Sequence, residues 1–242
     1  MLDTSTFTMT IGEIVAADYR TAAVFRRHGI DFCCHGGRTL ERGCRDAGLN
    51  TVEILRELEE VTAAPAGSGP HFNSWDLPTL VSYIVSKHHA YVREMLPLLI
   101  EHSRKIAEVH RHRHPELPRV AQLVQEIARD MTSHMMKEEQ VLFPYIVQLA
   151  TAVAERRHAP RAAFGSVENP IHMMEAEHES AGHAMLEIRE LTDGFLVPDE
   201  ACATYAVCLR ELEAFERDLH THVHLENNIL FPKASALETT CK

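Results

Sequence analysis

Two stretches of the chain share one frame of residues that could bind metal. Residues 130–144 read DMTSHMMKEEQVLFP and residues 218–232 read DLHTHVHLENNILFP, so both follow the pattern D-x3-H-x3-E-x3-L-F-P. Side chains four residues apart lie on one face of a helix, which places each histidine beside the glutamate that follows it. An unpaired carboxylate among apolar neighbours costs several kcal/mol. The duplicated frame therefore predicts that His134, Glu138, His222 and Glu226 converge on cations rather than form solvent-facing ion pairs.

Further ligands would have to come from other helices, because four-helix bundles build metal sites from side chains that project inward from all four helices. Four imidazoles and two carboxylates suit iron or manganese, whereas zinc rarely takes six protein ligands. On the residues alone the choice of the remaining histidines stays open among His88, His89, His172, His178 and His183.

A second group of reactive residues lies near the N-terminus, where Asp31–Arg38 reads DFCCHGGR. Taken alone, Cys33 and Cys34 could form a metal site, a disulfide or a redox pair. Adjacent cysteines fit one tetrahedral ion poorly, and a glycine-flanked helix start would lower a thiol pKa and make the thiol reactive. We therefore interpret Cys33 and Cys34 as redox thiols on a mobile module that visits the metal-binding part or a partner.

Composition limits the class of protein. The net charge of −11 argues against nucleic acid or an anionic membrane as partner. The longest apolar runs are too short to cross a bilayer, and the first residues lack the pattern of a signal peptide, so we expect a cytoplasmic protein with reduced thiols. The 17 histidines of this acidic chain favour intracellular metal chemistry.

The elements that must position these residues are predicted to be helical throughout. A Gly-, Pro- and Ala-rich linker at 63–73 separates a small domain, 1–62, from a larger one, 74–242. The small domain is predicted to hold three short helices, the first running from a capping box at Thr10 and Glu13 to Gly29. The larger domain has four long amphipathic stretches with short connections, which predicts an antiparallel four-helix bundle. The fold class is therefore all-α.

These motifs resemble the hemerythrin-like HHE metal-binding domain, and the whole chain resembles the di-iron family of iron–sulfur cluster repair proteins of the ScdA/YtfE/DnrN/NorA type. The stretch DFCCHGGRTL is similar to the D-[FY]-C-C-x-G-G signature of that family. SHMMKEEQVLFP, MEAEHESAG and HVHLENNILFP are similar to its bundle motifs. The resemblance covers nearly all of the sequence and has two separate modules in the expected order.

The resemblance implies a hemerythrin-like bundle and a specific ligand set. The family has a ligand histidine eight residues before a Leu-Pro proline, which selects His89 over His88. The stretch MEAEH selects His178. The implied cofactor is a non-haem pair of iron ions with an oxo or hydroxo bridge, bridged also by Glu138 and Glu226. Asp130 and Asp218 either orient the ligand histidines one turn away or, as we favour, are exposed. The full implied ligand set is His89, His134, Glu138, His178, His222 and Glu226.

The same resemblance implies the function: repair of iron–sulfur clusters damaged by nitrosative or oxidative stress, by iron donation or by handling nitric oxide. One alternative is a di-iron nitric oxide reductase that forms N2O, with Cys33 and Cys34 as redox relay. Another is a carrier or sensor of O2 or NO. The expected partners are damaged iron–sulfur proteins with NO and O2 as small ligands, and the chain could also form a homodimer. Whether the protein is an enzyme stays open.

Overall fold

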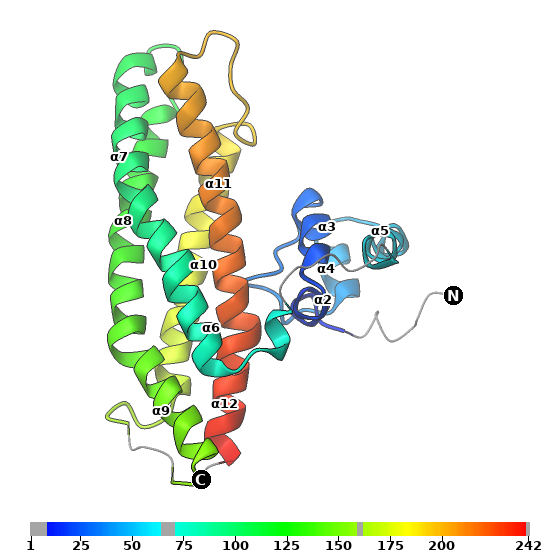
Figure 1. Cartoon of the computed structure of the whole chain (residues 1–242). Helices are drawn as coiled ribbons and strands as arrows, with labels where there is room; N and C mark the ends of the chain where they lie inside the picture. The colour runs from blue at the N-terminus through cyan, green and yellow to red at the C-terminus, as the bar shows by residue number, and fades with distance from the viewer. Residues whose placement is uncertain (1–8, 64–70, 159–161, 241–242) are drawn as a thin grey trace.

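The computed structural model describes residues 9–63, 71–158 and 162–240, and within these ranges the protein is built from helices (Figure 1). The described residues contain no strand, only an isolated β-bridge between Thr10 and Thr39. The predicted all-α fold class is confirmed. None of the described helices is both long and apolar enough to cross a membrane.

The small domain begins with the predicted capping box. The Thr10 hydroxyl accepts a hydrogen bond from the Glu13 amide at 3.2 Å, and the Glu13 carboxylate accepts one from the Thr10 amide at 2.8 Å. The expected single helix to Gly29 is wrong. Asp18 breaks it, because its carboxylate accepts a hydrogen bond from the Arg20 amide and starts a new turn. The elements of this domain are α2 (Ile11–Ala17), η1 (Tyr19–Thr21), α3 (Ala22–Arg27), α4 (Leu40–Asp46) and α5 (Thr51–Ala63).

Most of the predicted linker, 64–70, lies outside the described residues, so the domain boundaries stay a prediction. After this gap the first element is a 3-10 turn, η2 (Phe72–Ser74). The Phe72 side chain is buried, and its ring packs edge-on against the ring of Tyr19 in the small domain, with 6.1 Å between the ring centroids. The same ring also packs against Tyr83 of the bundle. The small domain therefore lies against the bundle beside this turn.

The large domain forms four long columns that run alternately up and down (Figure 1). Asp76 caps the first column, and its carboxylate accepts a hydrogen bond from the Thr79 amide at 2.8 Å. The columns are α6 (Leu77–Tyr83), η3 (Ile84–His89) and α7 (Ala90–His110); α8 (Leu117–Lys137), η4 (Glu138–Leu142) and α9 (Phe143–Ala154); α10 (Glu168–Leu191); and α11 (Ala203–Leu225), η5 (Glu226–Leu230) and α12 (Phe231–Thr240).

Three of the columns contain a π-helical turn at the level of the candidate ligands. His89 is the last residue of η3, Glu138 is the first of η4, and Glu226 is the first of η5. Single π turns inside α-helices are uncommon and occur frequently at functional sites. The π turns therefore lie at the same level of the bundle as the histidines and glutamates of the sequence repeat.

Two apolar clusters lie on either side of that level. One joins the long part of the bundle to the small domain and includes Met131 and Leu219. The other fills the end formed by α6, α9 and α12 and includes Leu142 and Leu230. The candidate ligands lie between them, as a polar layer within an apolar core.

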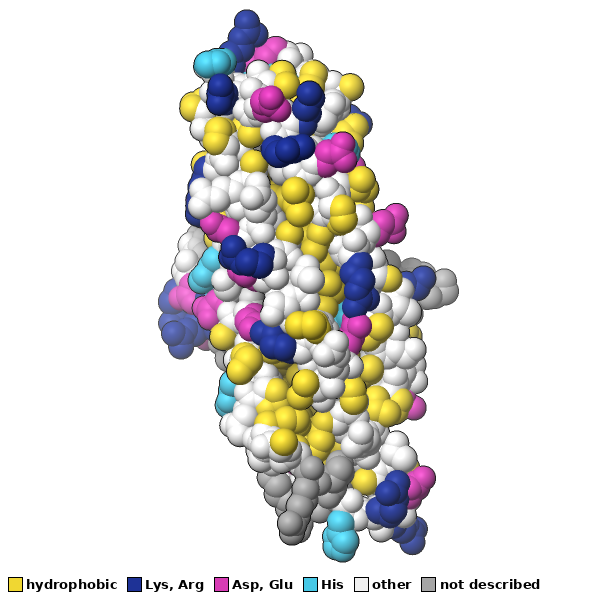
Figure 2. Space-filling model, turned by 90° about the vertical axis from the view of Figure 1, so that its left-hand side faces the viewer, with side chains coloured by type: hydrophobic (Ala, Val, Ile, Leu, Met, Phe, Trp, Pro, Cys, Tyr) yellow, Lys and Arg dark blue, Asp and Glu magenta, His cyan; other side chains and the backbone are white. Residues whose placement is uncertain are grey.

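The side of the bundle on which α7 and α8 lie carries a band of apolar side chains with charged groups along its margins (Figure 2). A groove of about 760 Å³ between these helices is lined by residues that include Pro97, Met135 and Met136. Glu139 and Arg93 also line it. The groove therefore reaches the carboxylate that contacts His89, as described below.

Candidate metal centre

Six side chains converge at the middle of the bundle, and each of these residues is 1% exposed or less. They form two sets of four that share both glutamates, and in each set the candidate ligand atoms lie within 4.8 Å of one another. One set is His89, Glu138, His222 and Glu226, and the other is His134, Glu138, His178 and Glu226. The structure brings together all six predicted ligands.

The first set is built by η3, η4 and the junction of α11 with η5. His89 Nε2 lies 3.1 Å from His222 Nε2 and 3.3 Å from Glu138 Oε2. His222 Nε2 lies 3.0 Å from Glu226 Oε1, one helical turn further along the chain. The atoms that face one another are the ones that metal ions use in histidine and glutamate.

The second set repeats this pattern with α8 and α10. His134 Nε2 lies 3.0 Å from His178 Nε2 and 3.2 Å from Glu138 Oε2. His178 Nε2 lies 3.0 Å from Glu226 Oε2, so the two oxygens of Glu226 face different histidine pairs. Each carboxylate is placed to serve two cations at once.

The polar atoms of this centre fit a cation better than they fit one another. Neither oxygen of Glu138 has a hydrogen-bond partner among the described residues, although both are buried. In each set two Nε2 atoms point at one another, and a pair of imidazole nitrogens can share only one hydrogen bond. Nitrogen and carboxylate donors of this kind suit iron, manganese or zinc.

The electrostatics agree with that fit. Burial alone would lower the pKa of His89, but the nearby carboxylates of Glu138 and Glu226 outweigh it and raise the pKa to about 10. The pKa of His134 is raised to about 9, because the field of Glu138 outweighs burial. Burial would raise the pKa of Glu226, but the neighbouring histidines hold it well below its usual range. Without metal, the centre therefore holds protons on imidazoles to balance its two carboxylates.

A second layer of polar groups orients two of the histidines from the bundle surface. His89 Nδ1 lies 2.6 Å from Glu139 Oε1, and Arg93 binds the same oxygen. His134 Nδ1 lies 2.9 Å from Glu177 Oε2, and Lys137 pairs with that carboxylate. These contacts favour a proton on each Nδ1, which leaves Nε2 as the nitrogen that would bind a metal ion.

The other two histidines are held differently. His178 Nδ1 donates to the side-chain oxygen of Asn227 at 2.8 Å. His222 Nδ1 is buried without a hydrogen-bond partner among the described residues, and its ring stacks on His88 at a centroid distance of 5.6 Å. The four histidines are therefore not equivalent, and two of them depend on partly exposed carboxylates.

The structure separates the ligand candidates that the sequence left open. His88 turns away from the centre and contacts Asp218 at 2.9 Å, and His172 and His183 are exposed on α10. Asp130 is exposed and pairs with Arg129, as the favoured interpretation expected. For Asp218 that interpretation is wrong, because its side chain is only 22% exposed and contacts His88.

The carboxylates that do orient ligands, Glu139 and Glu177, were not predicted. Each is an acidic residue directly adjacent to a ligand in the sequence: Glu139 follows Glu138, and Glu177 precedes His178. An acidic residue directly next to a candidate ligand is therefore the sequence feature from which Glu139 and Glu177 could have been predicted.

The thiols lie apart from this centre, in the loop between α3 and α4. Cys33 is buried and Cys34 is half-buried, and their sulfurs are 3.9 Å apart. The loop is docked on the bundle, because the side-chain amide of Asn228 donates to the Cys33 carbonyl at 3.1 Å and that of Asn227 does so at 3.5 Å. Asn227 thus contacts both this loop and His178.

The expectation of a thiol activated by a helix start is wrong for Cys33. Helix α4 begins only at Leu40, with Thr39 as its N-cap, so the thiols do not lie at the start of that helix. A hydrogen bond with Cys34, burial and the negative charge of Asp31 raise the pKa of Cys33 well above its usual value. Cys33 is therefore a protonated thiol at neutral pH.

Comparisons with known proteins agree with the geometry. Residues 80–234 match the hemerythrin HHE cation binding domain, and residues 8–62 match ScdA_N, a domain of unknown function. The chain is 35% identical over 226 residues to a protein of Pectobacterium atrosepticum named iron-sulfur cluster repair protein YtfE, with 93% of this chain and 96% of that protein covered. A protein of the same name from Pectobacterium carotovorum shows the same identity and coverage, and one from Yersinia pestis is 34% identical with equal coverage. The resemblance noted in the sequence is confirmed.

Proposed function

This chain belongs to the hemerythrin HHE cation binding family, and from that premise we propose that it binds two iron ions and serves in the repair of damaged iron–sulfur clusters. The observation that carries the proposal is the pair of glutamates shared by two histidine pairs, buried at one level of the bundle. The names of the relatives support the assignment to repair.

The proposed ligands have two roles: the glutamates supply negative charge to both ions, and each pair of histidines binds one ion. Glu138 and Glu226 would offset part of the charge of both cations and hold them close together. His89 and His222 would bind one ion, and His134 and His178 the other. The iron pair would supply iron for rebuilding a cluster and positions that bind small molecules such as NO and O2. The apolar clusters on either side limit water around the ligands.

The partly exposed second layer supports a role in delivering iron. The side chains of Glu139 and Glu177 are 26% and 32% exposed, yet each contacts a ligand histidine that is fully buried. A partner protein that engaged either carboxylate would loosen a ligand histidine without entering the core. We propose that damaged iron–sulfur proteins are the recipients of that iron. Nitric oxide reduction, a carrier or sensor role, the homodimer and the cytoplasmic location stay predictions from the sequence.

Metal analysis of anaerobically purified protein tests the iron centre. We expect about two iron ions per chain for the wild type, as in other dinuclear carboxylate bundles. The double variant Glu138→Leu/Glu226→Leu should lose the iron and keep its helical circular dichroism, because apolar residues of similar volume replace buried charges without loss of packing. Glu94→Leu, an exposed site on α7, is the matched control. Iron retained in the double variant would refute the ligand set, and zinc as the main metal of the wild type would refute the iron centre.

Reactivation of a cluster enzyme damaged by nitric oxide tests the function. The iron-loaded wild type should restore activity to the damaged enzyme, with iron appearing in the enzyme as it leaves the bundle. The double variant should not. Restoration by the double variant at the wild-type rate would separate repair from the metal centre and overturn the proposal.

A further inference from the structure

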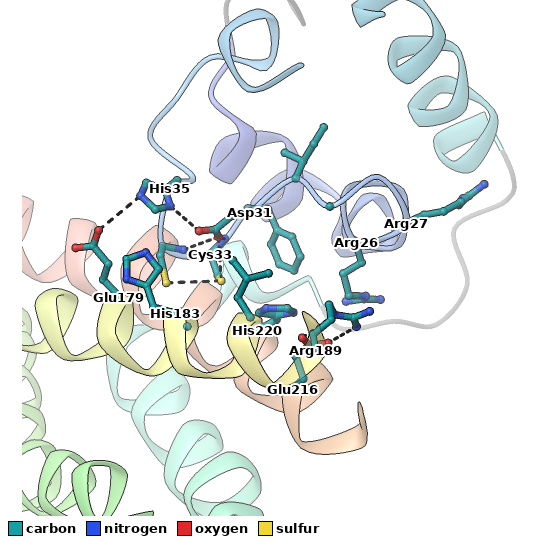
Figure 3. A pocket seen from close by; sticks show the side chains of 16 residues that line it. Arg26, Arg27, Asp31, Cys33, His35, Glu179, His183, Arg189, Glu216 and His220 are labelled. Atoms are coloured by element: carbon teal, nitrogen blue, oxygen red, sulfur yellow. Dashed lines mark hydrogen bonds and ion pairs between the residues drawn. The ribbon is translucent and has the colours of Figure 1, made fainter. Parts of the chain in front are cut away.

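A pocket of about 430 Å³ lies between the small domain and the bundle, next to the thiols (Figure 3). Helix α3 and the loop after it form one wall, and α10 and α11 form the other. Cavities of this volume hold small organic molecules. None of the six proposed iron ligands lines it.

One end of the pocket is a thiol surface. Cys33 and Cys34 both line it, and Figure 3 shows Cys33, His35 and His183 grouped at this end. Cys34 is the more accessible of the two thiols, because Cys33 is only 4% exposed. The Cys33 sulfur lies 3.2 Å from an Asp31 carboxylate oxygen and 3.9 Å from Cys34 Sγ, so it is enclosed by its neighbours. Cys34 is therefore the sulfur placed to react with a ligand in the pocket.

The other end is cationic, with Arg26 and Arg189 side by side in Figure 3. Arg189 is bound by Glu216, and its Nε lies 2.9 Å from a carboxylate oxygen. Arg26 has no ion-pair partner among the described residues. His220 also lines the pocket, and its Nδ1 is buried without a hydrogen-bond partner. A ligand that brought a carboxylate to this end would satisfy groups that the chain leaves unpaired.

We propose that this pocket binds a low-molecular-weight disulfide whose halves carry carboxylates, with a carboxylate near Arg26 and a sulfur at Cys34. The Cys34 thiol gives its proton to water, and the thiolate attacks one ligand sulfur. The disulfide bond of the ligand breaks, a mixed disulfide forms on Cys34, and the other half leaves as a thiolate. Cys34 is oxidised and the leaving half is reduced, so the exchange balances without a further reactant. This site is distinct from the proposed iron centre.

The experiment uses the full chain in a Cys202→Ser/Cys241→Ser background, which removes one exposed thiol and one near the C-terminus. The probes are glutathione disulfide, which is anionic, and cystamine, which is cationic and lacks carboxylates. Intact mass and peptide mapping follow the rate and position of the adduct. We expect glutathione disulfide to modify Cys34, and Cys34→Ser to abolish that adduct.

The charge test separates the pocket from simple thiol reactivity. Arg26→Gln should slow the reaction with glutathione disulfide about threefold, the size of one partly exposed ion pair, and leave cystamine unchanged or faster. Arg42→Gln, an exposed arginine outside the pocket, is the matched control. Equal effects of Arg26→Gln on both probes, or an adduct that maps away from Cys34, would overturn the proposal. Iron content is measured in parallel, so that failure here is distinguishable from failure of the metal centre.

Discussion

Replacing Glu177 with alanine should weaken one of the two proposed metal positions and spare the other. Glu177 contacts His134 Nδ1 at 2.9 Å and is 32% exposed, whereas the His134 side chain is 1% exposed. A hydrogen bond to a charged group contributes about 1.5–3 kcal/mol, and the exposure of Glu177 favours the lower end. About 1.5 kcal/mol corresponds to roughly tenfold in affinity, which lies within the range for outer partners of metal ligands.

Chelator competition under anaerobic conditions measures this loss for each iron equivalent. One equivalent should bind roughly tenfold more weakly in Glu177→Ala, and the other should be unchanged because His89 and His222 do not contact Glu177. Glu177→Gln keeps a hydrogen-bond acceptor and loses the charge. Its affinity for the weakened iron equivalent should therefore lie between those of the wild type and Glu177→Ala. The matched control is Asp130→Asn, one turn before His134, since Asp130 pairs with Arg129 and has no other ion-pair partner among the described residues. Equal weakening of both equivalents, or a loss in Asp130→Asn as large as in Glu177→Ala, would refute the reasoning.

Three further predictions concern a ligand choice, the domain contact and stability at high pH. His89→Ala should lose at least one iron equivalent in metal analysis while His88→Ala keeps both, and the reverse order would show that the ligand is misassigned. Asn228→Ala removes hydrogen bonds of 3.1 and 3.3 Å to the carbonyls of Cys33 and Phe32 in the thiol loop. Labelling of Cys33 by a thiol reagent should therefore be roughly tenfold faster in this variant. An unchanged labelling rate would mean that another contact holds the loop. Burial raises the pKa of Cys208 from its usual value of 9.0 to about 12. Its neutral thiol therefore contributes stability that is complete below pH 9 and lost as the pH rises toward 12. Denaturant unfolding should show this decline, and the same decline in Cys208→Ala would contradict its cause.

The cluster of candidate ligands was largely predictable because it depends on local geometry. A histidine and a glutamate four residues apart share a helix face in any helix, so the pairs at 134/138 and 222/226 follow from spacing alone. The choice of His89 and His178 needed the resemblance, because each has other histidines close by in the sequence. The partners of the ligands depend on which helices become neighbours. Glu139 reaches His89 from another column, 50 residues away in the sequence.

The docking of the thiol loop could not be predicted for a similar reason. It depends on Asn227 and Asn228 of the bundle, which both donate to the Cys33 carbonyl, and Asn228 lies against the backbone of the small domain. A Cβ atom at Gly12 or Gly36 would come within 2.3 Å of the Asn228 side-chain oxygen, so only glycine fits at these positions. The glycines of the motif had suggested a helix start that activates a thiol. The structure uses one of them for a close contact between domains.

The π turns at η3, η4 and η5 separate the packing of the bundle from the shape of the candidate metal centre. A π turn holds one residue more than the α turn that it replaces, so each resembles a single-residue insertion retained within a helix. The extra residue is absorbed within the turn, so the helix that follows stays in phase with the helix before it. Deleting one residue from η4 would therefore restore an α turn and leave Phe143 in the apolar core. The same deletion would move the backbone at the level of Glu138, so the candidate metal centre would change while the bundle kept its packing.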